Sequence, residues 1–121
     1  MNANDLKART KEFALRILKL VAALPKTIEG RAIASQLVRS GTSIAANYRS
    51  ACRARSKAEF IAKLGVALEE ADETQLWLEL IIEGKLMSSI RVRPLLNEAD
   101  ELVAIFVSSR KSAGLNLKSE M

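Results

Sequence analysis

The 121-residue sequence contains no histidine, one cysteine, two prolines and five glycines. Without histidine the chain lacks the commonest general base and the commonest metal ligand, and the Glu-x-x-His pairs of di-metal bundles cannot be built. Cys52 has no partner for an internal disulfide and no histidine to activate its thiol, so we interpret it as a small apolar core residue. We therefore expect no enzyme, no catalytic residue, no metal site and no cofactor.

Long apolar runs are also missing. No run of eighteen apolar residues could cross a membrane, and no basic and apolar leader with a cleavage site begins the chain. The sequence thus predicts neither a membrane partner nor secretion, and we expect a cytoplasmic protein. Nothing in it indicates a small-molecule substrate.

The residues that are abundant favour helices. Hydrophobic residues make up 49% of the chain, Ala, Leu, Glu, Lys and Arg are frequent, and no stretch alternates strictly between apolar and polar. A chain of this length can bury a core as one domain, residues 1–121. We predict an all-α fold, an antiparallel up-down-up-down four-helix bundle.

Local signals place the four helices. The first begins at a cap on Asn4 or Asp5 and ends at Pro25, and the second runs from an N-cap at Thr27 to about Arg53. The third follows Ser56, with Glu59 at the spacing of a capping box, and breaks near Gly84. The fourth begins at Ser88 or Ser89 and ends near Arg110. The polar tail, residues 111–121, is predicted to be frayed or disordered.

The second helix has a core face of small and apolar residues. Leu37, Gly41, Ile44, Tyr48 and Ala51 recur at steps of three and four, which places them on one side of a helix. Gly41 lowers helix propensity by roughly 1 kcal/mol relative to Ala. We expect close approach of a neighbouring helix at Gly41 to offset that loss.

Charge is distributed unevenly along the chain. Residues 26–63 hold eight Lys and Arg against two Glu, whereas residues 64–87 hold one Lys against six Asp and Glu. The acidic cluster Glu69, Glu70, Asp72 and Glu73 is interpreted as a solvated or ion-pairing helix face rather than a metal site. One copy of the chain therefore carries a basic segment and an acidic segment. This asymmetry suits a head-to-tail contact between copies, and such contacts close into a ring when the rotation permits.

Several basic residues cluster near the turn between the second and third helices, where guanidinium groups could bind phosphates. The candidate nucleic-acid-binding residues are Arg49, Arg53, Arg55, Lys57 and Lys63. Arg39 lies further down the bundle, and we expect it to pair with carboxylates. The alternative is that the arginines of the turn also pair with the acidic segment, in the same chain or in a neighbouring copy. Should the turn not bind, Lys7, Arg9, Lys11 and Arg16 form the next basic surface.

Aromatic residues limit the mode of binding. The three Phe residues and Tyr48 fall on predicted core faces, and only Trp77 is a candidate for an exposed ring. Proteins that read single-stranded bases usually stack them on exposed aromatic side chains. Any nucleic acid should therefore be bound by phosphate contact and shape, with little sequence specificity.

The centre of the chain resembles a known family, the 23S rRNA intervening-sequence proteins of bacteria. The likeness covers about Leu6 to Arg110 and is carried by Gln36-Leu37, Arg39, Ser43-Ile44, Asn47-Tyr48-Arg49, Ala58-Glu59-Phe60, Ala67-Leu68, Glu70-Ala71 and Glu79-Leu80. Many relatives have an acidic residue and a glycine where Ser50 and Ala51 follow Arg49 here. The family is also similar to the accessory variability proteins of diversity-generating retroelements. The resemblance implies a four-helix bundle, a ring-shaped homopentamer, a basic surface and nucleic-acid affinity.

Two functions follow from these observations. The first is a non-catalytic, oligomeric, nucleic-acid-binding module. The second is a structural or scaffold oligomer whose charged surfaces serve only self-assembly and partner docking.

Overall fold

The computed structural model describes the backbone of residues 1–120 and the side chains of residues 1–115. Over this part of the chain the elements are α1 (Ala3–Ala22), α2 (Ile28–Cys52), α3 (Lys57–Glu83) and α4 (Ser89–Glu120). No described residue forms a strand, so the predicted all-α class is confirmed. None of the helices in the described part is long and apolar enough to cross a membrane.

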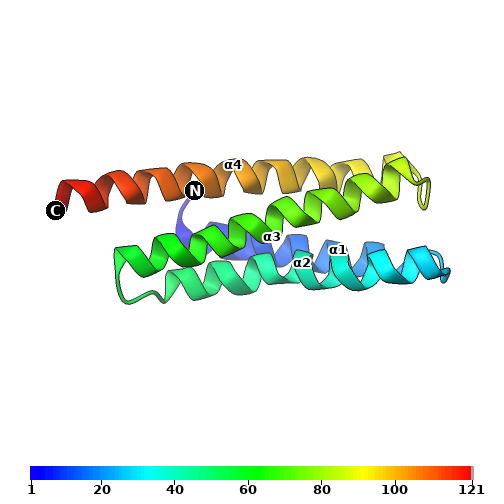
Figure 1. Ribbon diagram of the computed structural model, residues 1–121, viewed down its shortest axis with the longest axis horizontal. Coiled ribbons are helices and arrows are strands. Elements are labelled where there is room, and N and C mark those ends of the chain that lie inside the picture. The colour runs from blue at the N-terminus through cyan, green and yellow to red at the C-terminus, as the bar shows by residue number, and fades with distance from the viewer. Residues whose placement is uncertain (121) are drawn as a thin grey trace.

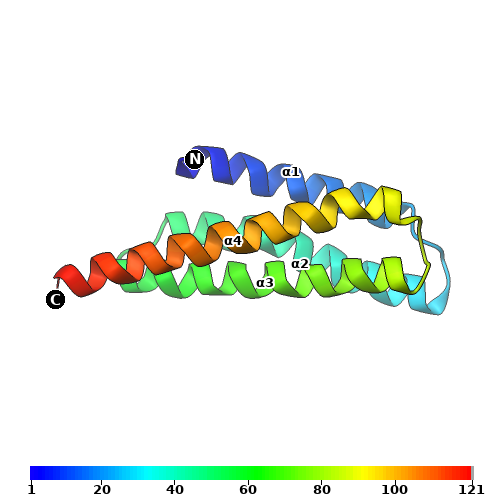
Figure 2. The ribbon, with the colours of Figure 1, turned by 90° about the horizontal axis from the view of Figure 1, so that it is seen from above.

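The helices form an antiparallel bundle in which each packs on the next along the chain (Figure 1). The α1–α2 and α3–α4 connections lie at one end, and the α2–α3 turn lies at the other. The contact between α1 and α4 is the smallest, and Figure 2 shows the two helices separating toward the N-terminal end of α1. The predicted four-helix bundle is therefore present, with α1 attached mainly through α2.

Polar caps begin the first three helices. Asn2 Oδ1 accepts a hydrogen bond from the Asp5 amide at 2.9 Å, and Asp5 Oδ2 accepts one from the Asn2 amide at 3.2 Å. The first cap is thus Asn2, not the predicted Asn4 or Asp5, because Asp5 at the third helical position completes a capping box with Asn2. The predicted caps Thr27 and Ser56 are confirmed, since their hydroxyls accept amide hydrogen bonds at 3.1 Å.

The third helix ends at the predicted glycine. Gly84 is the C-cap of α3, and its amide donates to the Leu80 carbonyl at 2.8 Å. The left-handed residue is the next one, Lys85, at φ 57°. Since Leu86 then donates to the Ile81 carbonyl at 3.0 Å, the chain reverses within a few residues and starts α4 beside α3.

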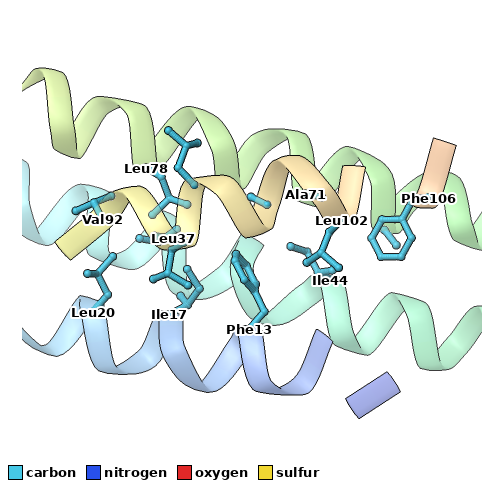
Figure 3. Packing of buried hydrophobic residues seen from close by; sticks show 14 of the residues in the cluster. Phe13, Ile17, Leu20, Leu37, Ile44, Ala71, Leu78, Val92, Leu102 and Phe106 are labelled. Atoms are coloured by element: carbon cyan, nitrogen blue, oxygen red, sulfur yellow. The ribbon is translucent and has the colours of Figure 1, made fainter. Parts of the chain in front are cut away.

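One apolar core runs the length of the bundle (Figure 3). All five predicted core residues of α2 are buried, and the ring of Tyr48 stacks on Phe106 of α4 at a centroid distance of 5.9 Å. The largest fully buried side chains come from every helix: Phe13, Ile17, Leu37, Ile44, Leu64, Leu78, Ile81, Val92, Leu102 and Phe106.

At Gly41, α2 packs closely on α1. A Cβ atom added there would lie 2.9 Å from Cγ2 of the buried Ile17. The predicted role of Gly41 in close helix packing is confirmed.

The fourth helix is longer than expected. The sequence predicted that the fourth helix ends near Arg110, before a frayed or disordered tail. The predicted end is wrong, because α4 continues to Glu120, while Met121 lies outside the described residues. Ala113, Leu115 and Lys118 are good helix formers, and Gly114 is the least favourable residue of this segment, so the helix continues after it leaves the core. As Figure 1 shows, the end of α4 projects past the α2–α3 turn.

Candidate nucleic-acid interface

The α2–α3 turn presents three arginines at one end of the bundle. Arg53 is the C-cap of α2, Arg49 lies one helical turn before it, and Arg55 lies in the turn itself. Backbone hydrogen bonds from Arg53 to the Ser50 carbonyl and from Ala54 to the Ala51 carbonyl, at 3.1 and 3.0 Å, hold the turn. All three arginine side chains are exposed, and none forms an ion pair with a described residue. These three guanidinium groups are therefore available to bind an anion from outside the chain.

The two predicted lysines differ in their surroundings. Lys57 is exposed at the first residue of α3. Lys63 is half-buried: its ammonium donates to Ser50 Oγ at 2.8 Å and lies 3.5 Å from Glu59 Oε1. Lys63 thus joins α3 to α2, and these contacts reduce its availability to a ligand.

Arg39 behaves differently from the arginines of the turn. Its guanidinium contacts Glu70 Oε2 at 3.0 Å and also pairs with Glu73 Oε1. This ion pair lowers the pKa of Glu73 below its ordinary value, and the Trp77 indole contributes a hydrogen bond to the same carboxylate at 3.2 Å. The expectation that Arg39 pairs with carboxylates is confirmed. Trp77, the candidate exposed ring, is half-buried, because it packs against the edge of the apolar core.

Arg9 is another arginine that is paired with carboxylates of the same chain. Its Nε and Nη2 atoms each lie 2.7 Å from a carboxylate oxygen of Glu98, and Nη2 lies 2.8 Å from Glu101. These contacts join α1 to α4, and they lower the pKa of Glu98. Arg9 therefore does not belong to a free basic surface on α1. No local signal in the sequence indicates this pair, because its members are 89 positions apart.

The extension of α4 brings two further basic residues to the end of the bundle that carries the turn. Arg110 lies over Gly65, where a Cβ atom would be 3.1 Å from the guanidinium, and its Nε donates to the Ile61 carbonyl at 3.2 Å. Arg110 and the exposed Lys111 line a shallow hollow of about 400 Å³ between α3 and α4. Neither residue was predicted to belong to the site, because the apolar stripe that indicates the fourth helix stops before them.

A second hollow lies beside the turn. It measures about 440 Å³, has Tyr48, Cys52 and Phe60 among its lining residues, and includes Arg55 and Lys57. Cys52 is a free, half-buried thiol. Across the residues described, no three carboxylate or cysteine side chains are placed to hold a metal ion. Chemically, this end of the bundle offers guanidinium and ammonium groups for an anion such as a phosphate backbone.

Comparison with known proteins agrees with the fold. A family model described as 23S rRNA-intervening sequence protein matches residues 3–108. A solved structure from Bacteroides thetaiotaomicron VPI-5482, a protein with unknown function from the S23 ribosomal protein family, is 39% identical and superimposes with a TM-score of 0.84. The match covers 92% of this chain and 99% of that one. No curated protein matches.

Proposed function

The chain belongs to the 23S rRNA-intervening sequence protein family, and we propose that it is a non-catalytic, cytoplasmic, oligomeric protein that binds nucleic acid at the α2–α3 turn. The arginines of the turn contact phosphates, and sequence specificity is low. As part of this proposal the copies form a ring. The likeness to the accessory variability proteins of diversity-generating retroelements would make it a ring of five.

One contrast among the arginines carries the proposal. Arg39 and Arg9 each bind two carboxylates, whereas Arg49, Arg53 and Arg55 are exposed and form no ion pair within the described residues. An arginine that serves stability is expected to have a partner in its own chain. Three unpartnered guanidinium groups around one turn make a surface on which phosphates would replace water and counterions.

The aromatic residues support the low specificity. Phe13, Phe106 and Tyr48 are buried, Phe60 and Trp77 are half-buried, and the Trp77 indole is committed to Glu73. No aromatic side chain in the described part is fully exposed for base stacking. Recognition through phosphates fits this surface better than reading of bases.

A salt titration tests the proposal. Mobility shift or fluorescence anisotropy with mixed-sequence duplex DNA, single-stranded DNA and RNA should show binding that weakens linearly in log Kd against log salt. Similar affinities for unrelated sequences are expected. Absence of binding at about 50 mM salt, where phosphate contacts are strong, would refute the proposal.

The second candidate function is a structural or scaffold oligomer. One observation favours it: Glu69 and Asp72 on α3 are exposed and have no ion-pair partner among the described residues. Basic groups of a neighbouring copy could meet them. An oligomer that assembles normally and binds no nucleic acid would identify this function.

A further inference from the structure

Helix α3 has leucines on its outer side as well as in the core, and the outer leucines lie among acidic residues. Leu64, Ala71 and Leu78 are fully buried in the bundle, yet Leu76 and Leu80 on another side remain 49% and 40% exposed. Within one copy, nothing described covers the outer side.

Helix α1 carries a comparable exposed pair. Phe13 and Ile17 face the core, whereas Leu15 and Leu18, on the outer side, are 52% and 46% exposed. The four leucines thus form two separate apolar stripes, one on α1 and one on α3. These two helices do not contact each other across the bundle, so the stripes are different surfaces of one copy.

The charges beside the stripes are of opposite sign. Lys11 and Lys19 lie with Leu15 at steps of four along α1, while Glu69 and Glu79 lie seven residues before and three residues after Leu76 on α3. All four charged side chains are exposed, and none forms an ion pair with a described residue. Packing α1 on α1 would oppose lysines, and packing α3 on α3 would oppose glutamates. Packing of α1 on α3 joins opposite charges at all four of these positions, while Glu12, three residues before Leu15, is an exposed carboxylate on α1.

The two stripes also lie at the same level along the bundle. Gly41 of α2 abuts Ile17 of α1, and the neighbouring Ser40 is hydrogen-bonded to Thr74 of α3. Ile17 and Thr74 are therefore level. Because α1 and α3 run in the same direction (Figure 1) with the same rise per residue, Leu18 is close in level to Leu76 and Lys11 to Glu69.

We propose that α1 of one copy packs along α3 of the next, with Leu15 and Leu18 against Leu76 and Leu80. Lys11 faces Glu69 across this contact, and Lys19 lies within about 5 Å of the level of Glu79, a distance that the long lysine side chain spans. The contact joins two different surfaces, so it is heterologous. If neighbouring copies are related by rotation about an axis parallel to the bundle, α1 of one copy stays level with α3 of the next. Such a rotation allows a ring to close. The inference rests on the oligomer of the proposed function and names the surface that forms it. None of its residues belongs to the α2–α3 turn.

Charge reversal with rescue tests the contact. K11E/K19E and E69K/E79K should each convert the oligomer to monomers at micromolar concentration, as measured by light scattering or sedimentation. The chain that carries all four changes should reassemble, because reversed α1 then meets reversed α3. K26E/K85E, which makes the same charge change as K11E/K19E at exposed lysines in the connections, should leave the assembly intact. Assembly by both reversed variants, or no reassembly of the combined chain, would overturn the inference.

Mixing experiments give an independent readout if a charge-reversed chain does not fold, as judged by circular dichroism. L15E/L18E and L76E/L80E each keep one intact face. Each alone should be a monomer, and the mixture should form a one-to-one dimer and nothing larger. A mixture that stays monomeric, or that forms large oligomers, would overturn the inference.

The outcomes separate this inference from the proposed function. A monomeric wild-type protein would refute both the ring and this contact. An oligomer that all these variants leave intact refutes the contact alone. An oligomer that responds as expected but never binds nucleic acid supports the contact and refutes the nucleic-acid function.

Discussion

The hydroxyl oxygens of Ser40 and Thr74 are hydrogen-bonded at 2.9 Å in the interior, where α2 packs on α3. Both side chains are fully buried, and Thr74 Oγ1 is also 2.8 Å from the Glu70 carbonyl oxygen. This polar contact is adjacent to the Arg39–Glu73 ion pair, since Ser40 follows Arg39 and Thr74 follows Glu73, and it links the same two helices. It fixes how α2 and α3 are aligned, since a shift along either axis would leave a buried hydroxyl without its partner.

The first prediction concerns this pair. T74V keeps the shape of the side chain but leaves the Ser40 hydroxyl without its cross-helix partner, so it should lower the free energy of unfolding by about 1–3 kcal/mol. S40A/T74V should be less destabilised than the sum of the two single variants, because it removes both hydroxyls. Urea denaturation of the four proteins measures the coupling. Additive effects would mean that the hydroxyls do not act as a pair.

The second prediction concerns Gly41. G41A gains about 1 kcal/mol of helix propensity, yet its new methyl group would lie 2.9 Å from a side-chain atom of the buried Ile17. Overpacking of this kind typically destabilises by about 1–3 kcal/mol, so a net loss is expected. G114A is the matched control, because an added Cβ there meets no atom within 4 Å. A thermal melt in which G41A is more stable than wild type would contradict close α1–α2 packing.

The third prediction concerns pH and the Arg9–Glu98 pair. Arg9 holds the pKa of Glu98 below its ordinary value of 4.5, so the folded state binds fewer protons than the unfolded state in that range. The stabilisation is present above the unfolded pKa and is lost as the pH falls through the folded pKa. R9A should lower stability by roughly 1–2 kcal/mol at pH 7.

The control for this prediction is to compare the stability of wild type and R9A again at low pH. The difference in stability between wild type and R9A should shrink below the ordinary pKa of Glu98, 4.5, as measured by urea denaturation across pH. A difference that is independent of pH would show that Arg9 stabilises α1 by packing rather than by charge.

The fourth prediction concerns the proposed nucleic-acid site. R49A/R53A/R55A should weaken binding to all sequences alike and reduce the salt slope on duplex DNA by about 0.9 for each phosphate that the protein no longer neutralises. Anisotropy titrations at several salt concentrations measure this, with light scattering to show that the oligomer persists.

The control removes the same charge from the opposite end of the bundle. R31A/R91A/R93A changes three exposed arginines at the α1–α2 and α3–α4 end and should bind almost as wild type does. Equal decreases in affinity for the two triple variants would indicate attraction by net charge only. An unchanged slope in the first variant would move the site away from the turn, and dissociation of its oligomer would place the arginines in the contact between copies.

Helix boundaries depended mainly on local chemistry, and most of them could be predicted. Thr27, Ser56 and Gly84 act on backbone groups within four residues, so their effect can be read from neighbouring positions. The N-cap Asn2 was not predicted, although its partner Asp5 is only three residues away. Asn4 and Asp5 are also good N-cap residue types, so the sequence does not single out Asn2. The end of α4 was missed for a different reason: without an apolar stripe after Arg110, periodicity no longer indicated the helix.

Partners of charged residues were harder to predict. Arg39 was correctly assigned to carboxylates from its level along the bundle, but the specific partners Glu70 and Glu73 required the α2–α3 alignment. The Lys63–Ser50 bond and the Arg9–Glu98 pair were not predicted at all. The sequence contains several other carboxylates that could pair with these basic residues equally well.

The amino-acid sequence by itself determined the helices, their order and the core face of α2, because these follow from hydrogen bonds within a few residues and from the periodicity of apolar side chains. Only the tertiary structure decided which basic residues are paired and which stay free. It also decided which leucines stay exposed, because residue type alone does not distinguish Leu15, Leu18, Leu76 and Leu80 from the leucines of the core. The reason is geometric. The levels of the helices relative to one another are set by packing along the whole bundle, with contacts such as Ile17 against Gly41 and Ser40 against Thr74, and no local pattern encodes them.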